Sequence, residues 1–363
     1  MIGIINTVLV DNNTLNTILE HFSIEKKTYS FQPINQGFIN DTFLVLNNEA
    51  PVFILQRINH LVFKDVDGLM NNIGNALSYL KDSDYSFIAL AKTEDGNIYC
   101  THNNEQYWRL MSYIDQSTAY NTSTDSKIAA EAGRILGKFH QLLQKAPIDN
   151  FVDTIPQFHD LNLREDQFKS AMNQAASKKM ETAKNAIVFA KETLVRLQEL
   201  TQAELPLRIC HNDPKLNNIL FSKETNKALC LIDLDTIMKG YFYNDFGDAV
   251  RTIVNTAEED EQNHTKITFD ETLFEAFIAG LKTNTSFLTN EELKSLPLGA
   301  AFMPFIHGLR ALTDYLNNNV YYRISYENQN LDRCLSLFNF TKKALDKVSY
   351  MEAIIKEEFK QTS

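Results

Sequence analysis

The sequence predicts an α+β protein of two lobes, a small antiparallel sheet followed by a larger, mainly helical part. Before residue 113, apolar and polar residues alternate in short runs, which is typical of strands with one buried face. After residue 115, apolar residues recur at helical spacing. A chain of 363 residues is long enough for two such parts. We therefore expect a first domain at residues 1–113 and a second at residues 114–363.

Five strands and one helix are predicted in the first part. The strand runs are rich in Phe, Val, Ile and Leu, and a turn signal at residues 95–97 separates the helix from the last two strands. We expect strands at residues 29–33, 40–47, 51–58, 98–100 and 107–113, and the helix at residues 66–80.

The second part is predicted to be helical, apart from two short apolar runs at residues 207–210 and 219–233. The clearest apolar stripe includes Ile128, Ile135 and Phe139. We expect helices at residues 126–143, one or two between residues 163 and 201, and further helices at residues 270–281, 293–315 and 331–360.

Composition and charge argue against several classes of function. The net charge of −11 argues against nucleic acid as a partner, because such binding needs clustered Lys and Arg. No run approaches the roughly 20 apolar residues that span a bilayer, and residues 1–10 do not read as a signal peptide, so we expect a cytoplasmic protein with no membrane partner. The four cysteines form no metal-binding or paired motif, and we expect reduced thiols. The oligomeric state is left open.

Residues 211–218 read His-Asn-Asp-Pro-Lys-Leu-Asn-Asn, and this spacing is typical of a phosphoryl-transfer loop. Asp213 would accept the proton of an acceptor hydroxyl, and Asn218, five positions later, would bind Mg²⁺. Lys215 can offset the charge that develops on the transferred group. We interpret His211 as a hydrogen-bonding residue that holds the loop, not as a proton carrier.

A second acidic residue, Asp233, ends the apolar run at residues 228–232. A carboxylate fixed at the end of a strand suits a hard cation such as Mg²⁺, which prefers oxygen ligands. Asp233 and Asn218 are therefore predicted to bind the metal together.

Several stretches of the chain resemble the aminoglycoside phosphotransferase-like superfamily, and within it they are most similar to the N-acetylhexosamine 1-kinases. The stretches that carry the resemblance are residues 37–43, 54–59, 107–109, 158–160, 211–221, 231–236, 243–251 and 312–315. The resemblance implies a protein-kinase-like fold and ATP-dependent phosphorylation of the anomeric hydroxyl of a small-molecule sugar such as N-acetylglucosamine or N-acetylgalactosamine.

The resemblance also implies roles for individual residues. Asp213 matches the catalytic Asp, and Asn218 and Asp233 match the Mg²⁺ ligands. Asp245 matches an Asp that supports the catalytic loop. Arg310 and Tyr321 resemble positions that contact the sugar, and a forked donor and an aromatic ring suit hydroxyls and the apolar face of a sugar ring.

The first part departs from the protein-kinase pattern at the nucleotide. Its third strand offers Gln56 or Arg57 where a kinase has Lys, so Arg57 is the candidate donor to the phosphates. Only one glycine, Gly37, lies in the turn that would cover the phosphates, and with Asn40 it gives a short backbone cradle.

Two other functions stay open. The chain could phosphorylate another small alcohol, such as choline, homoserine or an aminoglycoside, for which Asp235 or Asp314 could pair with the positive charge. It could also be a nucleotide-binding module without catalysis, because the strand Lys is absent. The presence of Asp213, Lys215 and both predicted metal ligands argues against an inactive module.

Overall fold

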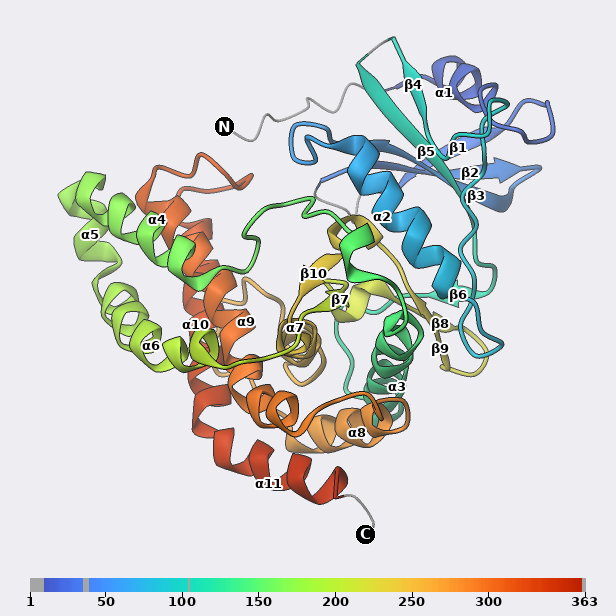
Figure 1. Cartoon of the computed structure of the whole chain (residues 1–363). Helices are drawn as coiled ribbons and strands as arrows, with labels where there is room; N and C mark the ends of the chain where they lie inside the picture. The colour runs from blue at the N-terminus through green and yellow to red at the C-terminus, as the bar shows by residue number, and fades with distance from the viewer. Residues whose placement is uncertain (1–9, 35–38, 104, 361–363) are drawn as a thin grey trace. The chain divides into compact units, whose positions relative to one another are not determined.

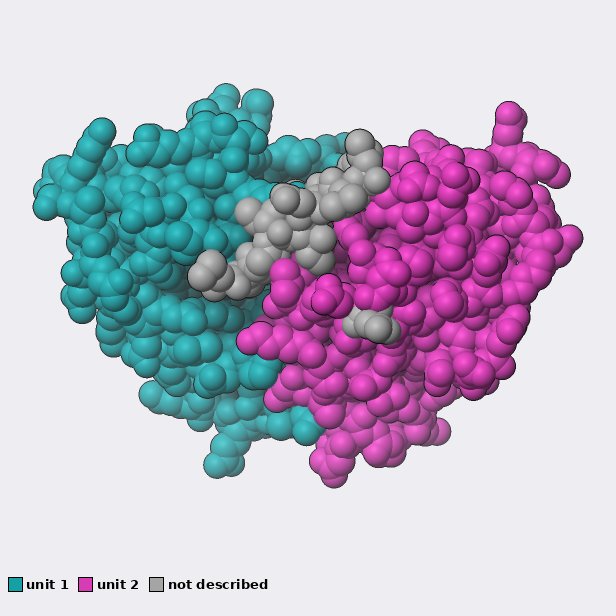
Figure 2. Space-filling model, turned by 90° about the horizontal axis from the view of Figure 1, so that it is seen from above, with its two compact units in different colours: residues 1, 118–144, 156–363 teal, residues 2–117, 145–155 magenta. Residues whose placement is uncertain are grey.

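The computed structural model describes residues 10–34, 39–103 and 105–360. The chain divides into two compact units, coloured in Figure 2. One contains residues 2–117 and 145–155, and the other contains residues 118–144 and 156–363. The predicted boundary between residues 113 and 114 lies close to the first division. The return of residues 145–155 to the first unit was not predicted.

The first unit is built on an antiparallel sheet in which the strands follow the order β1-β2-β3-β5-β4 (Figure 1). Alternation places Val45, Leu55 and Trp108 in its core, where all three are fully buried. The strands are β1 (Ser30–Ile34), β2 (Asp41–Asn47), β3 (Ala50–Ile58), β4 (Cys100–His102) and β5 (Gln106–Ser112). The five predicted strands are therefore present.

Two helices accompany this sheet. α1 (Asn12–Leu19) follows the N-cap residue Asp11 and adds Leu15 and Ile18 to the core of the sheet. α2 (Val66–Tyr79) holds the segment that returns to this unit, because the Asn72 side chain bonds both backbone groups of Val152, at 2.7 and 3.0 Å. That segment carries the short helix η1 (Ile148–Asn150).

The second unit is mainly helical. Figure 1 shows α3 and α8 side by side, and their contact is close because a Cβ atom on Gly280 would lie 1.8 Å from the Ala130 carbonyl oxygen. α9 packs on α7 and α10. The helices are α3 (Ser126–Leu143), α4 (Leu161–Gln174), α5 (Ser177–Thr182), α6 (Lys184–Gln202), α7 (Phe242–Ile253), α8 (Glu271–Lys282), α9 (Asn290–Leu316), α10 (Gln329–Asp346) and α11 (Val348–Glu358).

Two antiparallel strand pairs interrupt the helices. β7 (Arg208–Cys210) pairs with β10 (Met238–Gly240), and β8 (Ile219–Ser222) pairs with β9 (Ala228–Leu231). Between them lie the short helices η2 (Leu216–Asn218) and η3 (Leu234–Thr236). β6 (Ser117–Thr118) lies at the division between the units. The 211–218 segment thus connects β7 to β8.

The predicted α+β class is confirmed, with differences in single elements. The long helical stretch predicted from residue 163 is three helices, α4 to α6, and residues 331–360 form two helices, α10 and α11. α1 was not predicted. All four cysteines are buried and free. Among the described residues, no helix is both long and apolar enough to cross a membrane.

Candidate active site

The strand pair β8–β9 brings the two predicted metal ligands to the same end of a hairpin. Ile219 pairs with Leu231, and the Ile232 amide donates to the Asn218 carbonyl at 2.8 Å. Asn218 and Asp233 therefore leave adjacent strand ends, although fourteen residues of chain separate them.

The backbone of the loop is held by one buried carboxylate. Asp245, on α7, accepts hydrogen bonds from the amides of His211 and Asn212, both at 2.7 Å. Its Oδ2 is also 2.9 Å from Nε2 of His140, on α3. Because these donors surround a fully buried acceptor, they fix the start of the loop relative to two helices.

The His211 side chain also fixes the loop. Its Nε2 is 2.8 Å from the Ile232 carbonyl oxygen, to which it must donate. Its Nδ1 then accepts from the Asp213 amide at 3.3 Å, so the ring is neutral, with the proton on Nε2. The Thr236 hydroxyl donates to the His211 carbonyl at 2.7 Å. His211 thus connects the loop to the segment that carries Asp233.

Asn212 gives the loop its sharp turn. Its φ of 62° is in the left-handed region, which Asn tolerates better than most residues. Its side-chain amide donates to the Thr236 carbonyl at 3.0 Å. Gly240 makes room for this side chain, because a Cβ atom there would lie 2.8 Å from Asn212 Oδ1.

Asp213, Lys215 and Asn218 meet at one carboxylate oxygen. Lys215 Nζ is 2.8 Å from Asp213 Oδ2, and Asn218 Nδ2 is 3.0 Å from the same atom. Asn218 Nδ2 also donates to the Asp213 carbonyl oxygen at 2.8 Å. Oδ2 is therefore held, and Oδ1 is the oxygen that can accept a proton from a hydroxyl.

Lys215 keeps its positive charge in this setting. Burial alone would lower its pKa, but the carboxylates of Asp213 and Asp233 outweigh burial, and the pKa is raised above its usual value. A lysine that stays protonated beside the Asp213 carboxylate could stabilise negative charge on a transferred phosphoryl group.

Asn218 and Asp233 have the chemistry of a site for a hard cation. Because the Asn218 nitrogen is turned towards Asp213, its amide oxygen is the atom that can bind a metal. Asp233 has a φ of 60° and is exposed. One amide oxygen and one carboxylate fit Mg²⁺, which usually keeps water and phosphate as its other ligands.

The nucleotide candidates belong to the first unit. Gly37 lies outside the described residues. Asn40 Oδ1 accepts from the Asn59 amide at 3.0 Å. Arg57 is buried on β3, and its Nε donates to Asp41 Oδ2 at 2.8 Å. Its guanidinium also lies over the Trp108 ring, 5.8 Å from the ring centre. Arg57 is thus already paired within the sheet.

The sugar candidates are close to each other. Arg310, on α9, donates from Nη2 to the Tyr321 hydroxyl at 3.2 Å. The loop that carries Tyr321 is held by Asp314, whose carboxylate accepts from the amides of Tyr321 and Tyr322 at 2.8 and 2.9 Å. Asp314 therefore has a structural task.

Sequence reasoning assigned no role to a polar group beside the loop that contains His159, Asp248 and His307. His159 Nε2 donates to the Asn212 carbonyl at 3.1 Å, and His307 Nε2 is 3.2 Å from Asp248 Oδ1. Burial, and then His307, lowers the pKa of His159 to about 3. The signal available in the sequence was Asp248, three positions after Asp245, and the structure places both on α7.

Asp248 also belongs to a network of charged side chains that includes two arginines. Burial would raise the pKa of Asp248, but Arg251, whose Nε lies 2.6 Å away, outweighs burial and holds the pKa well below its usual value. Arg251 and Arg333 both pair with Glu259. Asp248 and Glu259 therefore neutralise these two arginines.

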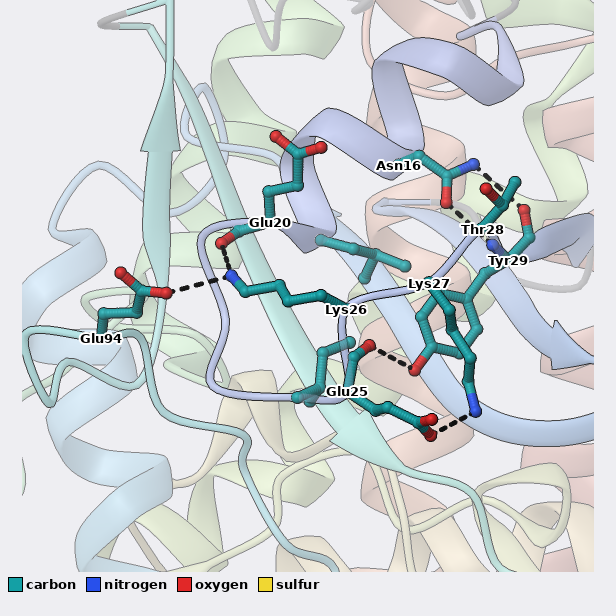
Figure 3. Close-up of a pocket in the computed structure, with 10 residues that line it drawn as sticks. Asn16, Glu20, Glu25, Lys26, Lys27, Thr28, Tyr29 and Glu94 are labelled. Carbon is teal, nitrogen blue, oxygen red and sulfur yellow. Dashed lines mark hydrogen bonds and ion pairs between the residues drawn. The ribbon is translucent and has the colours of Figure 1, made fainter.

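Two surface grooves formed by the described residues contain none of the predicted site residues. One, of about 590 Å³, lies in the first unit beside α1, where Lys26 bridges Glu94 at 3.0 Å (Figure 3). The other, of about 370 Å³, lies between α4 and α6. Because neither groove contains the candidate active site, the site is identified from the contacts among its side chains.

One known protein family matches most of the chain. The sequence model of the phosphotransferase enzyme family matches residues 30–281, which include the 211–218 loop and Asp233.

Solved structures show the same fold. The microcompartment-associated aminopropanol kinase is similar with a TM-score of 0.63 and 16% identity, over 94% of this chain and 99% of that one. Spectinomycin phosphotransferase, solved with ADP and spectinomycin, has a TM-score of 0.63 and 12% identity, over 94% of this chain and 99% of that one. Choline kinase from Cryptosporidium parvum has a TM-score of 0.58 and 14% identity, over 96% of this chain and 99% of that one. The predicted protein-kinase-like fold is therefore confirmed.

Proposed function

Because this chain belongs to the phosphotransferase enzyme family, we propose that it is a small-molecule kinase that uses ATP and Mg²⁺. Its acceptor is the anomeric hydroxyl of an N-acetylhexosamine, and its product is the sugar 1-phosphate. The observation that carries the proposal is the convergence of Lys215 and Asn218 on one oxygen of Asp213.

Asp213 acts on the acceptor. Its Oδ1 orients the attacking hydroxyl and takes its proton, while Lys215 stabilises the charge on the phosphoryl group in flight. His211 and Asp245 support the reaction indirectly, because they hold the loop backbone. Positioning and electrostatics, not covalent chemistry, are what phosphoryl transfer requires of a protein.

Asn218 and Asp233 hold the metal. When bound, Mg²⁺ neutralises the phosphate oxygens of ATP and aligns the terminal phosphoryl group. The adjoining ends of β8 and β9 support this assignment, because they place an amide oxygen and a carboxylate at the same end of a hairpin.

Residues 1–113 form the nucleotide-binding domain in this proposal, and residues 114–363 the catalytic and acceptor-binding domain. Gly37, Asn40 and Arg57 are the nucleotide contacts. Since Arg57 is paired with Asp41, it would reach a phosphate only by leaving that carboxylate. Spectinomycin phosphotransferase, of the same fold, was solved with ADP, which supports a nucleotide as the donor.

Arg310 and Tyr321 contact the sugar. The aromatic ring and the guanidinium are already joined by a hydrogen bond, so they present a preformed surface to a sugar ring and its hydroxyls. Other small alcohols are the second candidate class, because two proteins of the same fold act on aminopropanol and choline by their names.

A panel assay tests the proposal. ADP formation is followed with Mg²⁺ and ATP against N-acetylglucosamine, N-acetylgalactosamine, hexoses, choline, homoserine and an aminoglycoside. We expect turnover with an N-acetylhexosamine and a 1-phosphate product by phosphorus NMR. If only a non-sugar acceptor is phosphorylated, the proposed N-acetylhexosamine acceptor is wrong and the second candidate class, other small alcohols, takes its place. Nucleotide binding with no turnover on any acceptor would favour an inactive binding module.

A further inference from the structure

Two arginines of the second unit surround the same aromatic residue. The Arg310 guanidinium lies 5.3 Å from the ring centre of Phe158 and 5.8 Å from that of Tyr321. Arg164, on α4, donates from Nη2 to the Phe158 carbonyl oxygen at 2.8 Å and from Nη1 to Gln167 at 2.9 Å. We call Phe158, His159, Arg164 and Arg310 the arginine cluster.

Ion pairs among the described residues do not balance these two arginines; the Asp160 carboxylate raises the pKa of Arg164, but by less than Arg310 lowers it. Within residues 10–34, 39–103 and 105–360, neither Arg164 nor Arg310 forms an ion pair, whereas Arg251 and Arg333 are both paired with Glu259. Burial, and then the charge of Arg310, lowers the pKa of Arg164 to about 10. The cluster therefore carries excess positive charge on half-buried side chains, where such charge acts on a ligand more strongly than it would in open water.

Two buried polar atoms of the cluster lack a partner. Arg164 Nε, a donor, and His159 Nδ1, an acceptor, are buried and form no hydrogen bond with any described residue. Such atoms are costly unless water or a ligand satisfies them. One of these atoms is a donor and the other an acceptor, so an oxygen and a hydroxyl of a ligand could each satisfy one of them.

The cluster adjoins the catalytic loop. His159 Nε2 donates to the carbonyl of Asn212, the residue before Asp213, and its ring contacts that of Phe158, with 4.3 Å between the ring centres. The excess charge thus lies next to the residue that precedes Asp213 in the loop.

The aromatic and carboxylate side chains near the cluster that could bind an ammonium group already have other partners. Aromatic faces bind ammonium through cation–π contacts, but the Phe158 and Tyr321 rings already receive Arg310. Carboxylates bind ammonium directly, but Asp314 is bonded to the amides of its own loop and to Asn330 Nδ2, at 2.9 Å.

We infer that the arginine cluster makes this enzyme select acceptors that are uncharged or anionic at the recognised group and reject those that carry an ammonium group. Arg164 and Arg310 donate to an oxygen of the acceptor, and His159 accepts from a hydroxyl. The inference rests on the proposed phosphoryl transfer at Asp213, but not on the acceptor being a sugar.

The test compares acceptors that differ in charge and little else. N-acetylglucosamine is paired with glucosamine, and 3,3-dimethylbutan-1-ol with choline, at a pH where glucosamine is protonated. kcat/KM is measured for each with Mg²⁺ and ATP. Where neither member of a pair is turned over, calorimetry measures binding to the protein loaded with Mg²⁺ and AMP-PNP. Repulsion between like charges a few ångströms apart predicts a preference of at least about tenfold for the uncharged member.

Variants connect the preference to the cluster. Arg164→Gln and Arg310→Gln each remove one charge and keep hydrogen-bonding capacity, so each should bring the ratio of uncharged to cationic acceptor closer to one. Arg196→Gln, on α6, is the matched control, because its Nη2 only reaches the Leu345 carbonyl at 3.4 Å, and it should keep the wild-type ratio. A merely structural role would lower activity with both members of a pair equally.

The outcomes separate the inference from the proposed function. If both sugars fail and 3,3-dimethylbutan-1-ol exceeds choline, the sugar assignment is wrong and charge selection stands. If a cationic member equals or exceeds its uncharged partner, the inference is overturned, whichever acceptor class is used. It is also overturned if neither uncharged member binds, or if both cluster variants keep the wild-type ratio.

Discussion

At the scale of single residues, the two oxygens of Asp213 have different surroundings. Oδ2 receives Lys215 and Asn218, so the carboxylate cannot rotate freely, and Oδ1 is the oxygen left to accept from a hydroxyl. This arrangement resembles a general base that is oriented before its substrate arrives, which lowers the entropic cost of reaching the transition state.

Asp233→Asn should raise the Mg²⁺ concentration that gives half-maximal activity by at least about tenfold, because position 233 keeps an oxygen ligand but the metal loses the charged one of its two proposed protein ligands. Asn is chosen over Ala because it tolerates the left-handed φ of 60°. The measurement is a Mg²⁺ titration of turnover. Asp346→Asn, exposed near the end of α10, is the control, and equal Mg²⁺ dependence in both variants would remove Asp233 from the metal site.

His159→Gln should reduce the loss of stability on acidification. His159 has a folded pKa of about 3 and an ordinary pKa of 6.5, so the unfolded chain binds its proton first. Stability from this residue is complete above pH 6.5 and is lost as the pH falls from there towards 3, on the order of 1 kcal/mol per pH unit at most. Gln keeps a donor for the Asn212 carbonyl and does not titrate.

Urea unfolding of the wild type and His159→Gln at pH 7.5 and pH 4.5 checks this sign. We expect a smaller drop in the free energy of unfolding for the variant. An equal drop in both proteins would show that His159 takes up its proton in the folded state.

At the scale of elements, helix α7 positions the catalytic loop through Asp245. This carboxylate joins α7 to the amides of His211 and Asn212 and to His140 of α3. Thr252, the second-last residue of α7, also accepts from the Leu216 amide at 3.0 Å. The loop is thus fixed at both of its ends by the same helix.

Asp245→Asn should destabilise the second unit and slow turnover together. The new amide nitrogen would face an N–H group that it cannot accept from, which leaves a buried donor unsatisfied at a cost of about 1–3 kcal/mol. Urea unfolding and steady-state kinetics measure the two effects. Asp166→Asn, exposed on α4, should change neither, and a fully stable but slow Asp245→Asn would assign this residue a more direct role.

Some elements could be predicted from sequence better than others. The helix predicted at residues 126–143 is α3 itself, because a strong apolar stripe follows the N-cap Asp125. The breaks between α4, α5 and α6 fall at Ala175 and Ala183. Alanine is the best helix former, so propensity gave no sign that the chain would turn there.

At the scale of the whole molecule, some residues discussed above could be grouped from local sequence and others could not. Asp213, Lys215 and Asn218 belong to one short motif, so local spacing alone could predict that their side chains lie close together. The arginine cluster joins Arg164 to Arg310, which come from α4 and α9. Their proximity depends on how the helices pack, and a single sequence does not reveal such long-range contacts.

The division of the chain also follows from contacts that are distant in sequence. Residues 145–155 belong to the first unit through Asn72 and Val152, which are eighty residues apart. No change of composition marks this return. A boundary argued from patterning alone therefore came close to residue 117 and missed the second crossing.

The central claim is that Asp213 promotes phosphoryl transfer to a hydroxyl of a small molecule. Its most direct test follows label from γ-³²P-ATP to the acceptor in the wild type, in Asp213→Asn and in Asp166→Asn, with nucleotide affinity measured in parallel. We expect Asp213→Asn to lose about 10²–10⁴-fold in the transfer rate at unchanged nucleotide affinity, while Asp166→Asn matches the wild type. Transfer by Asp213→Asn at the wild-type rate would contradict the account.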